Sequence, residues 1–401
     1  PVRDIARELA VDGVLEGSVS RTARGVHMTV QLIYAPTDTH IWAESYDRDA
    51  GEAFALPVEL SQTIAKRLKV SVSPVSAQRP LNPEAHDLYL RGRYLWFTSG
   101  PEQSRKYFEK AIELQPDYAA AWSGLADSYA VAAWDGSPPR EAMERAESAG
   151  RKALELDDSL PEAHNTMAAV YFAGKWDWAN ADAESRRALD LNPNYAEARH
   201  LHAYILMAMG RPEEALQEQK RSTELEPFAR PWALGYVLIR LRRFDEAISE
   251  LRLRAQAERG DSTVHFMLSD AYWFKGMWKE SAEETEQACL LKGDQKCVSG
   301  IKHAFESRGK QGVAEWLLRD TKAQSRKGHI SPWLLAGAYA QAGRKEEALR
   351  SLEAAYRERS PKLVFLQNAP NFDSLHSDPR YQAIVKKMGL PPLQNGKVSA
   401  N

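Results

Sequence analysis

Cysteine is nearly absent from this sequence, which has 401 residues and only two thiols, Cys289 and Cys297. So few thiols exclude a fold that depends on a framework of disulfides. The two cysteines lie eight positions apart across a predicted turn at 292–294. We expect them to be small core residues, with a disulfide as the alternative. Neither a histidine nor a further cysteine is spaced to complete four ligands, so the sequence predicts no metal site.

An excess of charge of one sign is also lacking. Lys and Arg number 53 against 55 Asp and Glu, which gives a formal net charge of -2. A nucleic-acid-binding protein needs a basic surface to neutralise phosphates, so we expect no nucleic-acid binding by this chain. No stretch approaches the roughly 18 apolar residues of a membrane helix, so we predict no membrane span. The chain starts at Pro1, and we interpret it as a fragment or a processed product.

Motifs of catalysis are missing too. The sequence has no Gly-x-Gly-x-x-Gly, no Walker loop and no Gly-x-Ser-x-Gly elbow, which are patterns that cradle phosphates or expose a nucleophile. His200 and His202 are two residues apart. On a helix this places them about 200 degrees apart around the axis, so they cannot share a metal ion. We therefore predict that the chain is not an enzyme and has no catalytic residue and no cofactor.

What the sequence does contain is a repeat. Four similar phrases begin at Ala111, Ala153, Ala188 and Ser222, at intervals of 42, 35 and 34 residues. Each phrase ends one predicted helix, and a new apolar helix face follows it, as in the stretch 115–129. A period of this length indicates a solenoid of stacked helical hairpins, whose function lies on a surface.

The phrases resemble the tetratricopeptide (TPR) repeat family, whose period is about 34 residues. The residues that carry the likeness match six of seven positions of the family pattern, with Gly150 departing: Trp122, Leu125, Ala126, Tyr129, Ala146, Gly150 and Ala153. The resemblance implies a mostly α fold, a TPR α-solenoid of about seven to eight helical hairpins over residues 84–360. Residues 361–401 are predicted to be a C-terminal cap and tail, in which Pro379 opens a short helix.

Three stretches depart from the regular period. An insertion at 133–139 is expected to loop out between the two helices of the second hairpin. One extra residue is present near 175–178, in the third hairpin. Residues 297–327 fit the pattern poorly and are interpreted as a degenerate helical pair.

The first part of the chain has a different pattern. Strands are predicted at 14–20, 26–34 and 41–46, because apolar and polar residues alternate there and turns separate them. A helix is predicted on each side, over 3–10 and 54–70. A proline-containing linker at 73–83 then separates this segment, residues 1–72, from the solenoid.

This segment resembles the TolB-like domain of multidomain bacterial regulators. The likeness is carried by residues 4–9, 11–19, 31–33 and 40–48. In that family another strand and helix come first, so the resemblance implies a small, incomplete α/β domain with an exposed sheet edge. Exposed edges invite pairing, which predicts completion by another segment or a homodimer through the N-terminal sheet edge. Tails similar to 377–382 and 388–391 occur in regulators that join this segment to TPR repeats downstream of a winged helix, a kinase or a nucleotide cyclase.

The TPR register also predicts a concave groove lined by one face of the first helix of each hairpin. The residues on that face are Tyr89, Arg93, Trp96, Asn165, Phe172, His200, Tyr204, Trp232, Tyr236, Phe266, Asp270 and Trp273. Large aromatic side chains on such a face favour binding of a protein or peptide partner. The register also places Asp127 on the groove side, and it predicts a contact surface richer in the fourth to sixth repeats. Packing in the core, or against the N-terminal unit, is the competing interpretation of these aromatic residues.

The leading hypothesis is a non-enzymatic interaction or sensor module of a bacterial regulatory protein, which binds its partner in the TPR groove. One alternative is the regulatory half of a kinase or nucleotide cyclase whose catalytic domain lies upstream. The other is a structural assembly protein that multimerises through the sheet edge.

Overall fold

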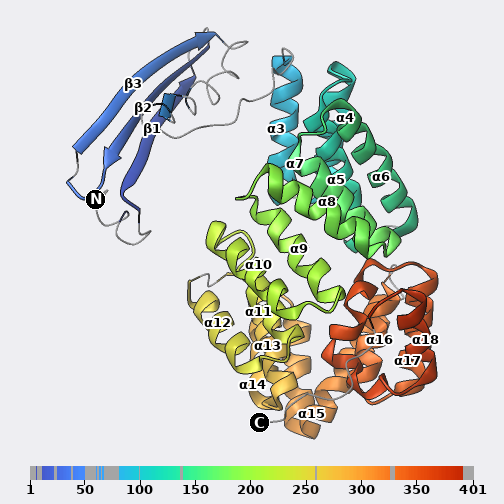
Figure 1. Ribbon diagram of the computed structural model, residues 1–401. Helices are drawn as coiled ribbons and strands as arrows, with labels where there is room; N and C mark the ends of the chain where they lie inside the picture. The colour runs from blue at the N-terminus through green and yellow to red at the C-terminus, as the bar shows by residue number, and fades with distance from the viewer. Residues whose placement is uncertain are drawn as a thin grey trace. The chain divides into compact units, whose positions relative to one another are not determined.

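The structure is a computed structural model, drawn in Figure 1. It describes residues 6, 11–21, 25–37, 39–49, 60, 63–64, 66, 81–98, 100–135, 139–257, 260–325 and 330–391. The chain divides into two compact units, residues 1–91 with 109–118 and residues 92–108 with 119–401. The predicted helices at 3–10 and 54–70 and the predicted linker at 73–83 lie largely outside the described residues.

The three predicted strands form one antiparallel meander, in the order β1-β2-β3: β1 (Gly13–Arg21), β2 (Gly25–Tyr34) and β3 (Thr39–Asp49). Leu32 pairs with Leu15 on one side and with Trp42 on the other. Because side chains alternate across a strand, these three residues share one face of the sheet. Val30, Leu32, Trp42 and Tyr46 form the buried cluster on that face.

The apolar face of the sheet continues onto β1, where it is exposed. Leu15 and Val19 share the face of the buried cluster through their pairing with Leu32 and Met28. Leu15 is 48% exposed and Val19 is 64% exposed. Among the described residues β1 pairs only with β2, so it is an edge strand that carries exposed apolar side chains, a combination that favours pairing with another strand.

Consecutive helix pairs follow in the rest of the chain, as the TPR register predicts (Figure 1). Their bounds are α3 (Pro83–Thr98), α4 (Pro101–Leu114), α5 (Ala119–Asp135), α6 (Pro139–Leu156), α7 (Pro161–Ala169), α8 (Trp178–Leu191), α9 (Ala196–Ala208), α10 (Pro212–Leu225), α11 (Ala233–Arg240), α12 (Phe244–Ala257), α13 (Ser262–Lys275), α14 (Trp278–Leu291), α15 (Gln295–Ser325), α16 (Pro332–Gln341) and α17 (Lys345–Arg357). The predicted fold class, a mostly helical solenoid preceded by a small sheet, is confirmed. Among the helices described, none combines the length and the apolar character that crossing a membrane requires.

Small residues at the stacking positions let neighbouring helices approach closely. Gly124 lies against the ring of Phe108, and a Cβ atom at Gly124 would come within 2.5 Å of that ring. Gly235 lies in the same way against Leu251, where a Cβ would come within 2.4 Å of the side chain. Phe108 and Leu251 are completely buried. A larger residue at either glycine would therefore push these helices apart.

Two of the predicted irregularities take a defined form. The extra residue of the third hairpin is accommodated by a π-helical turn, η2 (Val170–Lys175), which ends at Trp176 in the left-handed conformation, φ 57. The degenerate pair corresponds to α15, which contains a break at Arg308 and Gly309, so that two helices are joined across a kink. The predicted insertion at 133–139 lies partly outside the described residues.

The last part of the chain turns back toward helices formed much earlier in the sequence. We call residues 361–391 the return segment; it contains η3 (Pro361–Asn368), η4 (Pro370–Leu375) and α18 (Pro379–Lys387). The predicted short helix at Pro379 is thus present. Asn368 donates its Nδ2–H to the Met207 carbonyl at 3.1 Å, and Trp178 donates its Nε1–H to the Met388 carbonyl at 3.0 Å. In the contacts between elements, η3 of the return segment touches α9 and η2.

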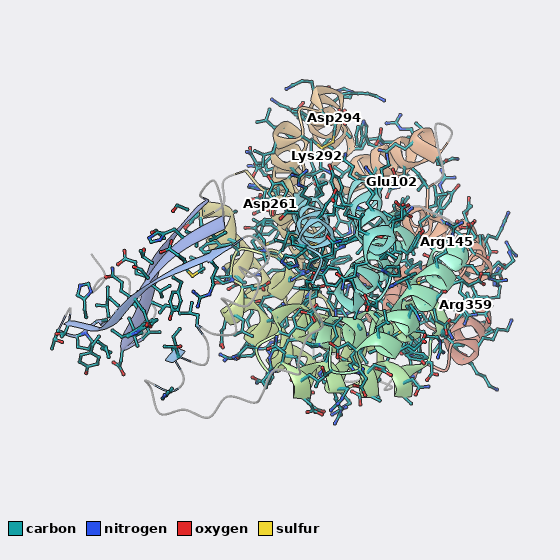
Figure 2. The ribbon with its side chains drawn as sticks, turned by 90° about the horizontal axis from the view of Figure 1, so that it is seen from above. Glu102, Arg145, Asp261, Lys292, Asp294 and Arg359 are labelled. Atoms are coloured by element: carbon teal, nitrogen blue, oxygen red, sulfur yellow. A yellow bond between two sulfur atoms is a disulfide. The ribbon has the colours of Figure 1, made fainter. Side chains whose placement is uncertain are left out.

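Two arginines at helix ends help to join the return segment and the last hairpin to the earlier repeats. Arg242, two residues after the end of α11, has a positive φ of 63. Arg359, two residues after the end of α17, has a positive φ of 57. Arg242 donates to the Asn368 carbonyl at 3.0 Å and to Asp373 at 2.5 Å. Arg359, labelled in Figure 2, donates to the Lys175 carbonyl at 3.0 Å and lies over the Trp176 ring.

The two cysteines form a disulfide, so the preference for two separate core thiols is wrong. Cys289 and Cys297 are joined with their Cα atoms 5.9 Å apart. The bond spans the predicted turn between α14 and α15, where Lys292 and Asp294 are labelled in Figure 2. Both cysteines are buried in a cluster with Ile301, so the disulfide is also part of a local core.

Candidate functional site

The predicted groove residues lie mainly on the first helices of the pairs. Within the larger unit these helices contact one another, α5 with α7, α7 with α9 and α11 with α13. The face that they share is not uniform along its length. The first part of this face borders a cavity, and the return segment covers the later part.

We call the first part the open pocket. It has a volume of about 160 Å³ and contains six of the residues predicted for the groove. The residues that line it are Arg93, Trp96, Asp127, Ala130, Val131, Trp134, Asn165, Thr166, Ala169, Phe172, Tyr195, Glu197, His200, Leu201 and Tyr204. They come from α3, α5, α7, α9 and the turns beside them. The TPR register thus brings together residues from separate hairpins, as the sequence predicts.

A carboxylate lies at the polar side of the open pocket. The side chain of Asp127 is 13% exposed, and Arg93 donates its Nη1–H to Asp127 Oδ2 at 3.3 Å. The Thr166 hydroxyl donates to the other carboxylate oxygen. Burial raises the pKa of Asp127 to about 6, although Arg93 and Thr166 act in the opposite direction. The carboxylate therefore holds a negative charge near neutral pH in surroundings that stabilise it incompletely.

Two further hydrogen-bond acceptors line the open pocket. Asn165 is 6% exposed, and its Oδ1 atom has no hydrogen-bond partner in the part of the chain that the structure describes. His200 Nδ1 lies 2.8 Å from Gln219 Oε1, an oxygen that can only accept, so Nδ1 carries the proton and Nε2 is the acceptor. Burial lowers the pKa of His200 to about 4, so its ring is neutral at physiological pH.

We call the later part of the shared face the filled groove, defined by Phe365 of η3 and the aromatic rings around it. Phe365 lies 5.0 Å from Tyr204, 5.6 Å from Tyr236 and 6.4 Å from Phe172 between ring centroids, each edge to face. The Arg240 guanidinium lies 5.1 Å from the centroid of the Phe365 ring. Phe365 is only 4% exposed, so the chain's own side chain occupies the position that the sequence assigns to a partner.

The filled groove also contains a carboxylate opposite an arginine. Asp270 lines a cavity of about 50 Å³ together with Arg240, Trp333 and Asn371. Burial raises the pKa of Asp270 to about 6, and Arg240 partly opposes this. Trp333 lies 4.9 Å from Phe372 of the return segment. The return segment therefore leaves little free volume here.

The other predicted groove residues lie elsewhere. Tyr89 belongs to the smaller unit, 5.3 Å from the Tyr118 ring. Trp232 precedes α11 and packs against His200 and Tyr236. Phe266 and Trp273 pack beside the cluster that contains the disulfide. Of the six predicted residues that line the open pocket, Phe172 is completely buried.

The prediction that the contact surface is richer in the fourth to sixth repeats stays a prediction. His200 and Tyr204 of the fourth repeat line the open pocket, whereas Tyr236 of the fifth repeat lies against Phe365 of the return segment. Sequence reasoning missed Trp134, Arg240 and Phe365. Only the apolar run at 363–366 could have drawn attention to η3, and its contacts lie well over a hundred residues away in the chain.

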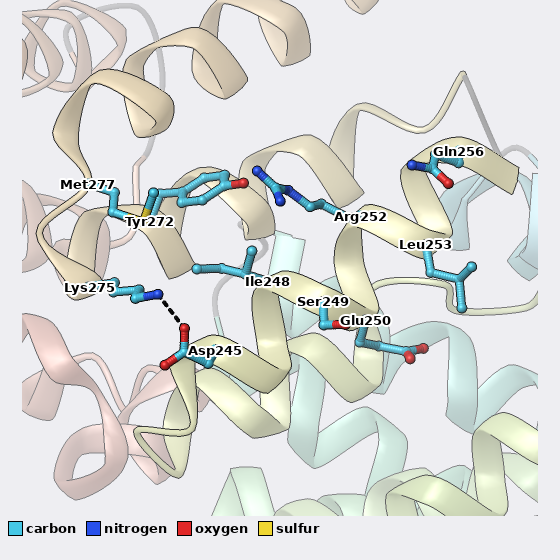
Figure 3. A pocket seen from close by; sticks show the side chains of 10 residues that line it. All are labelled: Asp245, Ile248, Ser249, Glu250, Arg252, Leu253, Gln256, Tyr272, Lys275 and Met277. Carbon is cyan, nitrogen blue, oxygen red and sulfur yellow. Dashed lines mark hydrogen bonds and ion pairs between the residues drawn. The ribbon is translucent and has the colours of Figure 1, made fainter. Parts of the chain in front are cut away.

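A larger depression lies between α12 and α13 (Figure 3). It has a volume of about 580 Å³, but its charged groups interact with one another. Lys275 forms an ion pair with Asp245, and the Arg252 guanidinium lies 5.5 Å from the centroid of the Tyr272 ring. This depression therefore has fewer polar groups available to a ligand than the open pocket, where buried hydrogen-bond acceptors line the cavity.

Comparisons with known proteins agree with the repeat. Family models of the tetratricopeptide repeat match residues 89–161 and 196–228. A Rhizobium meliloti (strain 1021) protein that bears the name adenylate cyclase 3 is 34% identical over 178 residues, which are 42% of this chain and 30% of that protein. This chain thus matches less than a third of the length of that relative.

Two of the similar solved structures are described as TPR proteins. YrrB, described as a TPR protein with an unusual peptide-binding site, is 23% identical, with a TM-score of 0.33 over 49% of this chain and 97% of YrrB. TTC0263, a TPR protein of Thermus thermophilus, is 18% identical, with a TM-score of 0.42 over 47% of this chain and 99% of that protein. Human IFIT1 is 16% identical, with a TM-score of 0.48 over 76% of this chain and 78% of IFIT1. On the family models and the repeat register, the chain contains tetratricopeptide repeats, arranged as a helical solenoid.

Proposed function

We propose that the solenoid is a non-enzymatic interaction module that binds a protein or peptide partner at the open pocket. The observation that carries this proposal is the contrast between a cavity of about 160 Å³ with buried polar atoms and the adjoining groove, which the chain fills itself. Clefts with a few convergent polar groups on apolar walls are the usual form of a binding site. TPR repeats commonly serve as interaction scaffolds, which agrees with this role.

A peptide-display library made from bacterial proteins, selected on the intact chain, tests the proposal. Val131 lines the open pocket and is half-buried, so Val131→Trp should fill the cavity and abolish capture of the selected peptides. The matched control is Leu253→Trp in the depression between α12 and α13, where Leu253 is 59% exposed. Equal capture by both variants would contradict binding at the open pocket.

The likeness to a protein named adenylate cyclase supports a second proposal, in which this chain is the regulatory half of a nucleotide cyclase. In that case occupancy of the open pocket would change the output of a catalytic domain in the same protein. Cyclic nucleotide formation by the full gene product, compared with its Val131→Trp variant, tests this idea. Absence of any cyclic nucleotide product would exclude it.

The TolB-like resemblance supports a further proposal about the sheet. Leu15 and Val19 are exposed beside the edge of β1 that has no partner strand among the described residues, which fits homodimer formation through this strand or a role as an assembly protein. Light scattering over a concentration series should then show reversible association. Replacing both Leu15 and Val19 by lysine should abolish that association, and a monomer at every concentration would contradict the proposal.

A further inference from the structure

Three of the residues that line the open pocket offer a hydrogen-bond acceptor. Asn165 Oδ1, the Asp127 carboxylate and His200 Nε2 can each accept a hydrogen bond. Asn165 Oδ1 is buried and has no donor within the described ranges. A buried acceptor without a donor is unfavourable, so a ligand that brings N–H groups would be stabilised here.

The charge of the pocket also favours a cationic ligand. Arg93 donates a hydrogen bond of 3.3 Å to Asp127. This contact is weaker than a bidentate arginine–carboxylate pair. The pKa of Asp127 is accordingly still raised. Glu197 lines the same cavity and forms an ion pair with Arg230, and His200 adds no positive charge. An anionic ligand would meet these carboxylates, and among the described residues around the pocket the arginines already engage Asp127 and Glu197.

The walls of the pocket fit a long side chain with an apolar stem. Val131, Trp134, Leu201 and Tyr204 present aliphatic and aromatic surface. The Arg93 guanidinium lies 5.3 Å from the centroid of the Trp96 ring, which shows that a cation is accommodated on such a wall. A cavity of about 160 Å³ is similar to the roughly 150 Å³ that holds one benzene ring, so it has room for one side chain.

We propose that the open pocket binds the side chain of a lysine or arginine of the partner, with the stem along Trp134 and Tyr204 and the N–H groups on Asn165 Oδ1 and the Asp127 carboxylate. This inference rests on the proposed function, because it names the residue by which the partner is recognised. A purely apolar side chain of the same length would leave Asn165 Oδ1 desolvated and without a donor, and it would bring no positive charge to the Asp127 carboxylate. Lysine and arginine satisfy both requirements because they bury the stem and keep the charged tip on polar atoms.

The test uses the intact chain and a library of acetylated, amidated pentapeptides with random flanks and one fixed central residue. Fluorescence polarisation should show that a central lysine or arginine binds about tenfold or more tightly than norleucine or glutamate, the range expected for hydrogen bonds to a charged group. Acetylating the lysine Nζ atom should remove the preference. This comparison changes only the peptide, so it does not depend on the folding of any variant.

Protein variants locate the preference. Asp127→Asn keeps the size of the side chain and Asn165→Leu removes the free acceptor, so each should reduce the preference for lysine over norleucine about tenfold. Asp270→Asn is the matched control, because Asp270 is a similar carboxylate in the filled groove, and it should leave the preference intact. A preference for another residue, or one unchanged in Asp127→Asn and Asn165→Leu, would overturn this inference while the proposed function stands. A library in which no peptide binds would contradict both.

Discussion

The open pocket and the filled groove are built from the same kinds of residue but differ in what occupies them. Each has a carboxylate opposite an arginine, Asp127 with Arg93 and Asp270 with Arg240, and aromatic walls. In the filled groove Phe365 lies among Tyr204, Tyr236 and Arg240, and a cavity of only about 50 Å³ remains, whereas the open pocket keeps about 160 Å³. The difference indicates that aromatic residues on the face of a repeat do not by themselves mark a binding site, since the chain can cover them.

The filled groove also shows how the repeat array is stabilised. The return segment joins its core to residues of α7 to α13 in one continuous cluster. A solenoid normally has only contacts between neighbouring repeats, but here residues 361–391 contact several repeats at once. We therefore expect changes in the filled groove to affect stability, and changes in the open pocket to affect binding.

The largest effect is expected for Phe365→Ala. Removing a ring that is 4% exposed should lower the free energy of unfolding by about 3–5 kcal/mol. Urea denaturation followed by circular dichroism measures the change. The control is Phe228→Ala, where the ring is 71% exposed, and a change within about 0.5 kcal/mol is expected. Similar small losses in both variants would mean that the return segment is not part of the core.

Reduction of the disulfide should have the next largest effect on stability. The bond joins residues separated by 8 positions, and closing a loop of this size stabilises the folded state by about 2–3 kcal/mol. The bond lies in a cluster separate from the filled groove, so reduction should not change peptide binding at the open pocket. Denaturation and polarisation measured with and without a reductant check both statements. Loss of binding on reduction would contradict the separation of the two regions.

The two buried carboxylates should make stability depend on pH in the same direction. Burial raises the folded-state pKa of Asp127 and Asp270 to about 6 from the usual 3.8. Because the folded protein binds these protons more tightly than the unfolded chain, protonation stabilises the fold at low pH. This stabilisation is lost as the pH rises from about 4 to 6, and above pH 6 the free energy of unfolding no longer changes through these two groups. Asp270→Asn should raise the free energy of unfolding by about 2–3 kcal/mol at pH 7.5 and leave it unchanged near pH 4. A gain that is the same at both pH values would contradict the burial of the charge.

A smaller net effect is expected for Arg242→Gly. The variant loses the hydrogen bonds to Asn368 and Asp373, which stabilise by about 1.5–3 kcal/mol because the donor is charged. It recovers about 1–2 kcal/mol, because glycine adopts the positive φ of this position without strain. The net loss should be about 1 kcal/mol by denaturation, with faster proteolysis of the return segment. A variant more stable than the wild type would show that Arg242 does not anchor that segment.

Local sequence patterns predicted most of the fold. The alternation over 26–34 predicted β2, and the spacing of Trp122, Leu125 and Ala126 predicted α5 and, by repetition, the later hairpins. These predictions succeeded because the period of apolar residues records which face of an element is buried. The extra residue near Trp176 also predicted an irregularity, although not the π-helical turn that accommodates it.

The candidate site could be predicted only in part. The register placed Arg93, Asn165 and His200 on one face, and the structure brings them to one cavity. The same register could not distinguish the open pocket from the filled groove, because that difference depends on Phe365, which meets Tyr204 across a separation in sequence that no local period reports. Long-range contacts of this kind become visible only when both segments are placed in space.

Photo-crosslinking from position 365 tests the central claim most directly. A photoreactive benzoylphenylalanine in place of Phe365 should form adducts within the same chain, on peptides that contain Tyr204 or Tyr236, because the Phe365 ring lies 5.0 Å and 5.6 Å from theirs. Tryptic digestion and mass spectrometry identify these adducts, and the pentapeptides that bind the open pocket should not reduce their yield. Adducts that avoid both tyrosine-containing peptides, or that the pentapeptides displace, would contradict the division into a filled groove and an open pocket.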